Sequence, residues 1–173
     1  SVCMNWLDEI RKFAPTLNPI LFGAGDRQLT LDSVKPFDLV VCSYGLLYQE
    51  SEKLTAIEWR VAVLDEAQAI KNTATKRSQA AMNLKADFRV ITTGTPIENH
   101  LGELWNLFRF VNPGLLGSLE QFNRRFAIPI EKHQDKDARH RLKKIIQPFI
   151  LRRVKEEVLE ELPSRTEILL HVE

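Results

Sequence analysis

The sequence predicts an α/β fold in which helices flank a parallel β-sheet and a helical extension follows on the C-terminal side. Three short apolar runs indicate the sheet: residues 39–42, 61–64 and 90–91. They are rich in β-branched residues and lack polar alternation, which is typical of strands buried on both faces of a parallel sheet. Between residues 113 and 163 no such run occurs, and apolar residues recur with helical spacing instead.

A fourth, weaker strand is predicted at residues 19–22, where Gly23 begins the turn that ends it. The segments 43–60 and 65–89 between the stronger runs are long enough for the crossover helices that parallel neighbours require. Residues 74–85 supply one such helix. These features predict repeated βαβ units in the first part of the chain.

The clearest helix follows Asn99, which we expect to be its N-cap, and ends at Asn112 before Pro113. Its apolar residues recur at spacings of three and four. Further helices are predicted at residues 118–126, 137–147 and 154–162, and Pro163 ends the last of them.

Composition and charge exclude several classes of protein. The chain has 173 residues, 44% of them hydrophobic, so one globular unit with a real core is expected. Its net charge of +1 makes no case for nucleic acid binding, and any basic footprint must be local. Cys3 and Cys42 match no metal or redox spacing, which fits a reduced intracellular protein. No signal peptide or membrane span is recognisable, and we expect no membrane partner.

Polar residues directly follow three of the predicted strands. In open parallel sheets, ligands bind in the crevice beyond the carboxyl ends of the strands, which is where these residues lie. The pair Asp65-Glu66 follows the second strong run. Adjacent carboxylates suit phosphoryl transfer, because one can hold Mg²⁺ through water while the other orients the attacking water. We assign these roles to Asp65 and Glu66 in that order. The alternative is a helix cap at Asp65, with Glu66 favourable to the helix dipole.

The wider context of this pair is decisive. Val-Leu-Asp-Glu-Ala-Gln, at residues 63–68, and Thr-Gly-Thr-Pro, at residues 93–96, resemble motifs II and III of superfamily-two helicase-like ATPases, whose lobes have a RecA-like fold. Further segments narrow the resemblance to the Swi/Snf family of DNA translocases: Asn5–Glu9 with Phe13-Ala14-Pro15 (motif Ia), Ser43-Tyr44 (motif Ib), Ile70-Lys71-Asn72, Thr95–Asn99 with Leu104-Trp105, Asn112-Pro113-Gly114 and Pro148–Arg153.

The resemblance implies a domain organisation. Residues 1–112 are then the C-terminal portion of an N-terminal RecA-like lobe that carries motifs Ia to III. Residues 113–163 form a helical protrusion and brace, and residues 164–173 begin a linker or strand toward a second lobe.

The resemblance also implies roles for single residues. Asp65 serves magnesium through water and Glu66 the water that attacks. Motif coupling is assigned to Gln68, Thr93, Gly94 and Thr95, and DNA contact to Ser43, Tyr44, Lys71 and Asn72. Two alternatives stay open: the segment from Thr93 is an ordinary turn, or Tyr44 is a half-buried aromatic whose hydroxyl finds a local partner. The family usually has His where this chain has Gln68, which cannot become charged.

A phosphate-binding loop is missing from the sequence, since no glycine is followed by lysine. The chain begins without a methionine and stops directly after residues 168–172, which resemble a strand without its continuation, so we expect both ends to be cuts. The resemblance then implies a P-loop upstream and a second RecA-like lobe downstream in the same polypeptide. ATP and Mg²⁺ are expected cofactors of the full-length protein. The chain alone should neither bind ATP tightly nor hydrolyse it.

The expected function is ATP-dependent translocation on double-stranded DNA that remodels protein–DNA complexes, with chromatin or RNA polymerase complexes as candidate partners. The location is the nucleoid-associated cytoplasm in a bacterium and the nucleus in a eukaryote. Two alternatives remain: another superfamily-two helicase, including a restriction-type translocase, and a degenerate lobe that only scaffolds partners. The basic residues from Arg139 to Lys155 either contact phosphates or form a solvated helix face balanced by nearby glutamates, and the sequence favours the solvated face.

Overall fold

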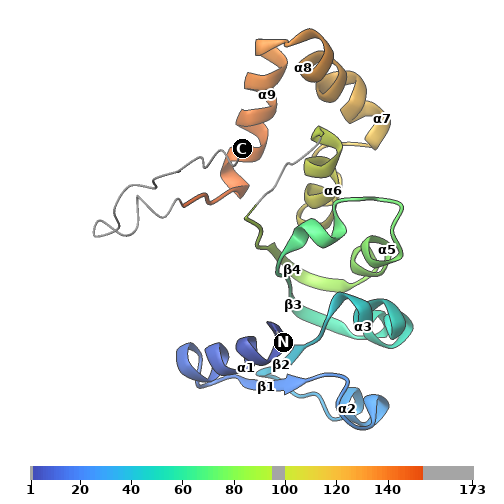
Figure 1. Cartoon of the computed structure of the whole chain (residues 1–173), viewed down its shortest axis with the longest axis vertical. Coiled ribbons are helices and arrows are strands. Elements are labelled where there is room, and N and C mark those ends of the chain that lie inside the picture. Colours follow the sequence, from blue (N-terminus) through green and yellow to red (C-terminus); the bar gives the residue numbers. More distant parts are fainter. Residues whose placement is uncertain (1, 95–99, 154–173) are drawn as a thin grey trace, which may run out of the picture.

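The computed structural model describes residues 2–94 and 100–153 (Figure 1). Its strands are β1 (Asn18–Leu21), β2 (Asp38–Val41), β3 (Glu58–Leu64) and β4 (Lys85–Ile91). The helices of the first part are α1 (Val2–Phe13), α2 (Arg27–Asp32), α3 (Tyr44–Gln49), α4 (Ser51–Ala56) and α5 (Lys76–Met82), with a 3₁₀ turn η1 (Ala67–Ile70). The second part holds α6 (Leu101–Val111), α7 (Leu119–Phe122), a π turn η2 (Asn123–Ala127), α8 (Ile128–His133), α9 (Lys136–Ile146) and a 3₁₀ turn η3 (Gln147–Phe149). The α/β part followed by a helical extension is therefore confirmed.

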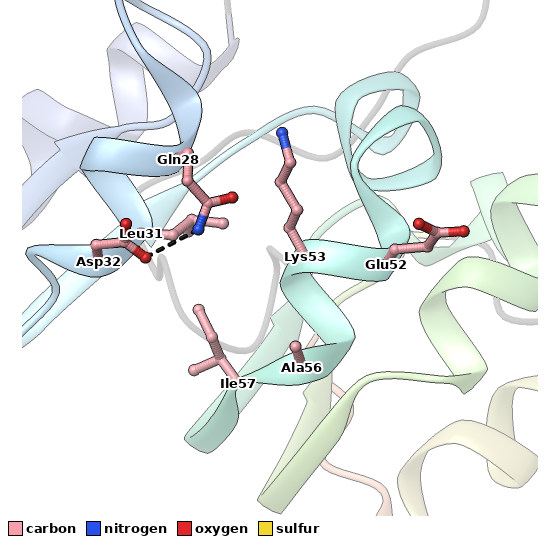
Figure 2. A pocket seen from close by; sticks show the side chains of 7 residues that line it. All are labelled: Gln28, Leu31, Asp32, Glu52, Lys53, Ala56 and Ile57. Carbon is pink, nitrogen blue, oxygen red and sulfur yellow. Dashed lines mark hydrogen bonds between the residues drawn. The ribbon is translucent and has the colours of Figure 1, made fainter.

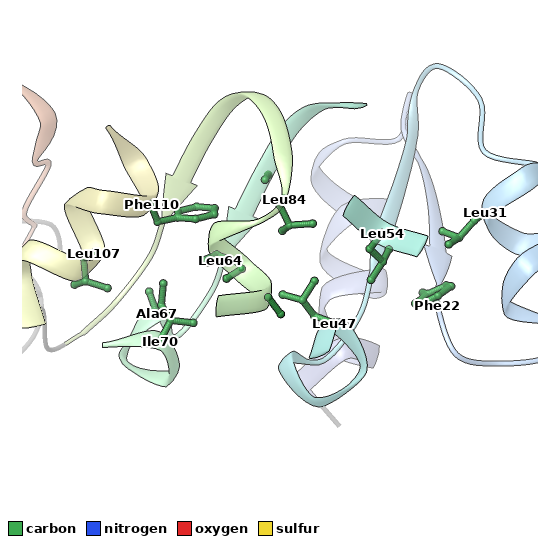
Figure 3. Packing of buried hydrophobic residues seen from close by; sticks show 13 residues of the cluster. Phe22, Leu31, Leu47, Leu54, Leu64, Ala67, Ile70, Leu84, Leu107 and Phe110 are labelled. Carbon is green, nitrogen blue, oxygen red and sulfur yellow. The ribbon is translucent and has the colours of Figure 1, made fainter. Parts of the chain in front are cut away.

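The strands pair in parallel, as predicted, but as two separate pairs. Strand β1 pairs with β2, and β3 pairs with β4. Among the described residues, side chains and not strand hydrogen bonds connect the two pairs. One apolar cluster, which we call the strand core, contains residues from the regions of both pairs. Its buried members include Phe22, Leu31, Leu47, Leu54, Leu64, Ala67, Ile70, Leu84, Leu107 and Phe110 (Figure 3).

The prediction that the strands are buried on both faces is wrong for β3 and β4. Ala62 and Leu64 face the strand core, whereas Val61, Val63 and Phe88 are 49%, 53% and 63% exposed. The register pairs Val61 with Phe88, so these side chains share one face of the sheet. No described element covers that face, which leaves an apolar surface on a parallel sheet.

Helix α6 begins at Leu101 with His100, not Asn99, at the N-cap, and His100 makes no side-chain cap bond. Glu131 of α8 supplies the missing acceptor, since its Oε1 lies 2.6 Å from the Leu101 nitrogen. A tertiary contact therefore replaces the local cap that the sequence predicted.

The extension has its own apolar cluster, the extension core. It comprises Leu104, Trp105, Phe108, Leu116, Phe122, Phe126, Ala127, Ile130, Ala138 and Leu142. The helix predicted at residues 118–126 continues beyond that range through η2 and α8 to His133, and α9 confirms the helix predicted at 137–147. The helix predicted at 154–162 lies outside the described residues. No helix of the described part is long and apolar enough to cross a membrane.

Candidate functional site

The ends of β2, β3 and β4 bring together most of the polar side chains that the sequence singled out. The register pairs Leu64 with Ile91, so Asp65 and Thr92 are the next residues on neighbouring strands. The Thr92 N–H donates to the Leu64 carbonyl at 2.9 Å, and the Ala67 N–H donates to the Thr92 carbonyl at 3.0 Å. These bonds fix the turn that carries Asp65 and Glu66.

Asp65 is held by three neutral donors. Its Oδ1 accepts from the Thr92 hydroxyl at 2.5 Å and from the Glu66 N–H at 3.0 Å. Its Oδ2 accepts from Trp6 Nε1 at 2.9 Å. The Thr92 bond is the largest cause of a lowered Asp65 pKa; partial burial opposes it, and the Trp6 and Glu66 bonds add to it. Asp65 is thus a charged carboxylate in a fixed orientation.

No Lys, Arg or His of the described ranges forms an ion pair with this carboxylate. Asp65 is not a helix cap either, because the residue at the N-cap of η1 is Glu66, which makes no side-chain cap bond. The negative charge of Asp65 is therefore available to a cation from outside the described part.

Glu66 lies beside Asp65 in an uncommon backbone conformation, with φ of 50° and ψ of 51°. Such left-handed geometry at a residue other than glycine is mildly strained and recurs at functional sites. The exposed Glu66 side chain accepts from Gln68 Nε2 at 2.6 Å, and Gln68 Oε1 accepts from the Thr93 hydroxyl at 3.0 Å. A chain of side chains therefore joins the end of β3 to the end of β4 through Gln68.

Tyr44 and Ser43 follow β2. The Tyr44 hydroxyl donates to the Asp65 carbonyl at 2.8 Å, and burial, together with the charges of Asp65 and Glu66, raises the Tyr44 pKa. The Ser43 oxygen accepts the Leu46 N–H at 3.2 Å and caps α3. Tyr44 thus has the half-buried position and local partner that the sequence left open as an alternative. Its role on DNA, like that of Ser43, stays a prediction.

The remaining predicted residues lie elsewhere or are not described. Lys71 Nζ lies 4.0 Å from Glu103 Oε1 of α6, and Glu103 is buried. The exposed Asn72 accepts the Ala74 N–H at 2.9 Å and shapes its own turn. Gly94 lies in an exposed bend where an added Cβ would meet nothing within 4 Å. Thr95 lies outside the described residues.

Trp6 and Thr92 are the two residues of this site to which the sequence gave no role. The role of Thr92 could have been predicted from the sequence. Its hydroxyl comes directly after one strand and Asp65 comes directly after the neighbouring strand, so the hydroxyl can reach the carboxylate. Trp6 is 59 residues away from Asp65 in the chain, and only the docking of α1 brings it close. Leu7 and Ile10 of α1 make that docking by packing on Val41 of β2. We call Asp65, Glu66, Gln68, Thr92 and Thr93, with Trp6 and Tyr44, the strand-end site.

The strand-end site fits a magnesium ion better than a protein-only metal cage. Among residues 2–94 and 100–153, no three His, Cys, Asp or Glu side chains gather closely enough to hold a metal. Mg²⁺ commonly takes one or two carboxylates and completes its shell with water and phosphate oxygens. Asp65, with its lowered pKa and free charge, matches that requirement.

A separate open pocket of about 380 Å³ lies between α2 and α4 (Figure 2). Three of its polar lining groups have partners: Gln28 donates to Asp32 at 2.8 Å, and Lys53 pairs with Glu50 at 2.8 Å. None of its lining residues belongs to the strand-end site. We assign it no role.

Comparison with known proteins adds independent evidence. The sequence model of the SNF2-related domain matches residues 1–173. The "Putative ATP-dependent helicase/translocase YwqA" of Bacillus subtilis is 42% identical over 172 residues, which cover 96% of this chain and 19% of that protein. The "Chromatin-remodeling ATPase INO80" of Arabidopsis thaliana is 35% identical over 188 residues, which cover 99% of this chain and 12% of that protein. The chain thus spans less than a fifth of these relatives.

A solved structure is similar in fold as well. The Sulfolobus solfataricus SWI2/SNF2 ATPase core in complex with dsDNA superposes with a TM-score of 0.77 and 44% identity, covering 88% of this chain and 32% of that one. The same core in a second structure gives a TM-score of 0.74 and 41% identity. These likenesses confirm the predicted α/β class with a partial sheet of the RecA-like type.

Proposed function

Because the chain belongs to the SNF2-related family, as its motifs predicted, we propose that it is part of an ATP-dependent translocase of double-stranded DNA. Two relatives support the proposal by their names, a helicase/translocase and a chromatin-remodeling ATPase. The structural neighbour solved with dsDNA supports duplex DNA as the track. ATP and Mg²⁺ are then the cofactors of the full-length protein.

The observation that carries the proposal is the Asp65 carboxylate, which is charged, oriented by three neutral donors and free of a cationic partner in the described part. When bound, Mg²⁺ would neutralise charge that develops on the transferred phosphoryl group. Asp65 would hold that ion through water. Glu66, exposed beside it, would orient the water that attacks the phosphorus.

The contact from Glu66 through Gln68 to Thr93 supports a coupling role for the loop after β4. Any movement of Thr93 changes the hydrogen bond on Gln68 and thereby the position of Glu66. DNA bound along this loop would in that way adjust the hydrolytic carboxylate. Gln68 can do this without charge, since its amide both donates and accepts.

The exposed apolar face of β3 and β4 supports partners within the same polypeptide. Parallel sheets are normally covered on both faces, and Val61, Val63 and Phe88 offer a surface for another layer. We place the segment with the P-loop there and assign the second RecA-like lobe to completing the ATP site. The boundaries after residues 112 and 163 are part of the proposal. So are chromatin or RNA polymerase complexes as partners, and a location at the nucleoid or in the nucleus.

The test is Glu66→Gln in the full-length protein. ATP binding should persist, while DNA-stimulated hydrolysis should fall by a factor on the order of 10² or more, because the carboxylate that orients water is lost. Glu58→Gln is the matched control, since Glu58 is exposed at the opposite end of β3. Binding is followed with a fluorescent nucleotide and turnover by phosphate release. Turnover in Glu66→Gln equal to that of the control would contradict the role of Glu66.

A further inference from the structure

The charge of the chain is distributed unevenly. Residues 112–153, which we call the extension, hold ten Lys and Arg against four Asp and Glu, a net charge of +6. Residues 1–111 hold twelve against thirteen, a net charge of −1. Residues 154–173, which lie outside the described part, hold two against six, a net charge of −4, so the whole-chain value of +1 hides this difference. A local basic footprint, which the composition left as the only route to nucleic acid, is therefore present.

The cations of the extension are exposed and lack acidic partners in the described part of the chain. The ion pairs of the described residues all lie in the first part: Arg11–Asp8, Arg27–Glu50, Lys53–Glu50, Arg60–Asp87 and Lys71–Glu103. Two of the extension's four acidic residues are engaged with backbone. Glu131 accepts the Leu101 N–H, and Asp135 accepts the Ala138 N–H.

Helix α9 carries five of these ten cations, and four of them share one face of the helix with His140. Ala138 and Leu142 are buried in the extension core, which fixes the rotation of the helix. The opposite side carries the basic face, defined as Lys136, Arg139, His140, Lys143 and Lys144. Lys136, Arg139 and Lys143 follow one another at spacings of three and four, so they form a stripe along successive turns.

We propose that the basic face of α9 binds the phosphate backbone of double-stranded DNA, at a second contact apart from the strand-end site. The inference rests on the proposed function, which supplies the duplex. Because these cations make no ion pair within the described residues, contact with phosphates breaks no ion pair there, and the counterions released from DNA favour binding. Figure 1 places α9 beyond α6, away from β1 and β2. The contact therefore lengthens the footprint on DNA.

The composition of the face favours a duplex backbone over single strands. Surfaces that bind single strands stack bases on aromatic rings between their cations. Helix α9 contains no Phe, Tyr or Trp. Phosphate contacts alone position a protein without reading sequence, so binding at this face should be independent of sequence.

The test measures how duplex binding depends on salt in the full-length protein. In the variant Lys136→Gln, Arg139→Gln, Lys143→Gln, the slope of log affinity against log salt should become shallower by about 2–3, because each lost phosphate contact removes about 0.9. Gln keeps a helix propensity close to that of Lys and Arg, so α9 should stay folded, as circular dichroism checks. The matched control removes three lysines of the first part, Lys12→Gln, Lys35→Gln, Lys85→Gln, and should keep the parent slope.

Hydrolysis at saturating DNA should match the parent, because the strand-end site is untouched. An unchanged slope in the α9 variant, or an equal loss in the control, would overturn the inference. Displacement of a polyglutamate peptide from the parent but not from the α9 variant, with the DNA slope unchanged, would also overturn it and assign the face to an acidic protein. A parent protein that fails to bind duplex DNA would instead overturn the proposed function.

Discussion

The strand-end region and the extension treat charge in opposite ways. At the strand ends, Asp65 takes three hydrogen bonds and Glu66 takes one from Gln68, so each carboxylate is oriented. In the extension, basic side chains point into solvent from a helix that is fixed only by its apolar side. The first arrangement suits chemistry at one atom. The second suits attraction to a large, repetitive polyanion.

The two regions are nevertheless joined by one helix. From α6, Leu107 and Phe110 enter the strand core, while Trp105 and Phe108 enter the extension core. Asn106, fully buried between them, donates to the Ile70 carbonyl and to the Ser78 hydroxyl. The difference between the regions is therefore one of surface chemistry, and α6 makes them one folded unit.

The largest expected effects come from breaking that unit. Phe110 lies in the strand core and Phe122 in the extension core, and both are fully buried. Truncating either to Ala should cost about 3–5 kcal/mol through lost burial and a residual cavity. Because α6 is shared, either change should speed hydrogen exchange in both regions of the full-length protein.

Phe13→Ala is the control for these truncations, since Phe13 is 71% exposed at the end of α1 and should behave like the parent. Faster exchange confined to the region that holds the mutation would contradict the shared unit. The two regions would then be separate folding units that α6 merely connects.

The sequence predicted which segments form strands, but it did not predict all of their bounds. Apolar runs located all four strands, because β-branched and aromatic residues favour strands whether one face or both are buried. The first half of β4 escaped, since Lys85, Asp87 and Arg89 break its apolar pattern. Their polarity is accommodated by tertiary contacts: Arg89 donates to the carbonyls of Leu84 and Phe110, and Asp87 pairs with Arg60. No local pattern contains such partners.

The candidate site shows the same limit. The carboxylates and Gln68 were recognisable because they are adjacent in sequence within a motif. Trp6 was recognised only as part of motif Ia, without a role at this site, because its partner Asp65 is distant along the chain and is reached only after α1 has packed on β2. In the extension, the sequence showed the basic residues from Arg139 onward and favoured a solvated face, whereas the structure adds that none of them forms an ion pair within the described residues.

A smaller effect is expected at Trp6. It tests whether the fixed orientation of the Asp65 carboxylate contributes to magnesium binding. Trp6→Phe removes one donor from Asp65. Asp65 should then orient Mg²⁺ less well, and half-saturation should need about fivefold more Mg²⁺, or about 1 kcal/mol for a lost hydrogen bond to a charged, partly exposed group. Magnesium titration of nucleotide binding to the full-length protein measures the shift.

Trp105→Phe is the matched control in the extension core, since it also loses one indole hydrogen bond, to the Gly117 carbonyl. It should leave the magnesium titration unchanged while lowering stability. Equal shifts in the two variants would mean that Trp6 acts through general stability and not through Asp65.

The smallest effect concerns ion pairing itself. The Arg60–Asp87 pair has side chains 89% and 66% exposed, so Arg60→Gln should change the free energy of unfolding by no more than about 0.5 kcal/mol. Lys136→Gln, which breaks no pair in the described residues, should change it as little. Denaturant titrations of the full-length protein at low and high salt measure both. A cost well above 1 kcal/mol for Arg60→Gln would mean that pairing supports the first part's stability. The expected near-equality would mean that paired and unpaired surface cations contribute equally little to the stability of the fold, so that the ion pairs of the first part and the unpaired cations of the described extension differ in surface chemistry and not in how they hold the fold.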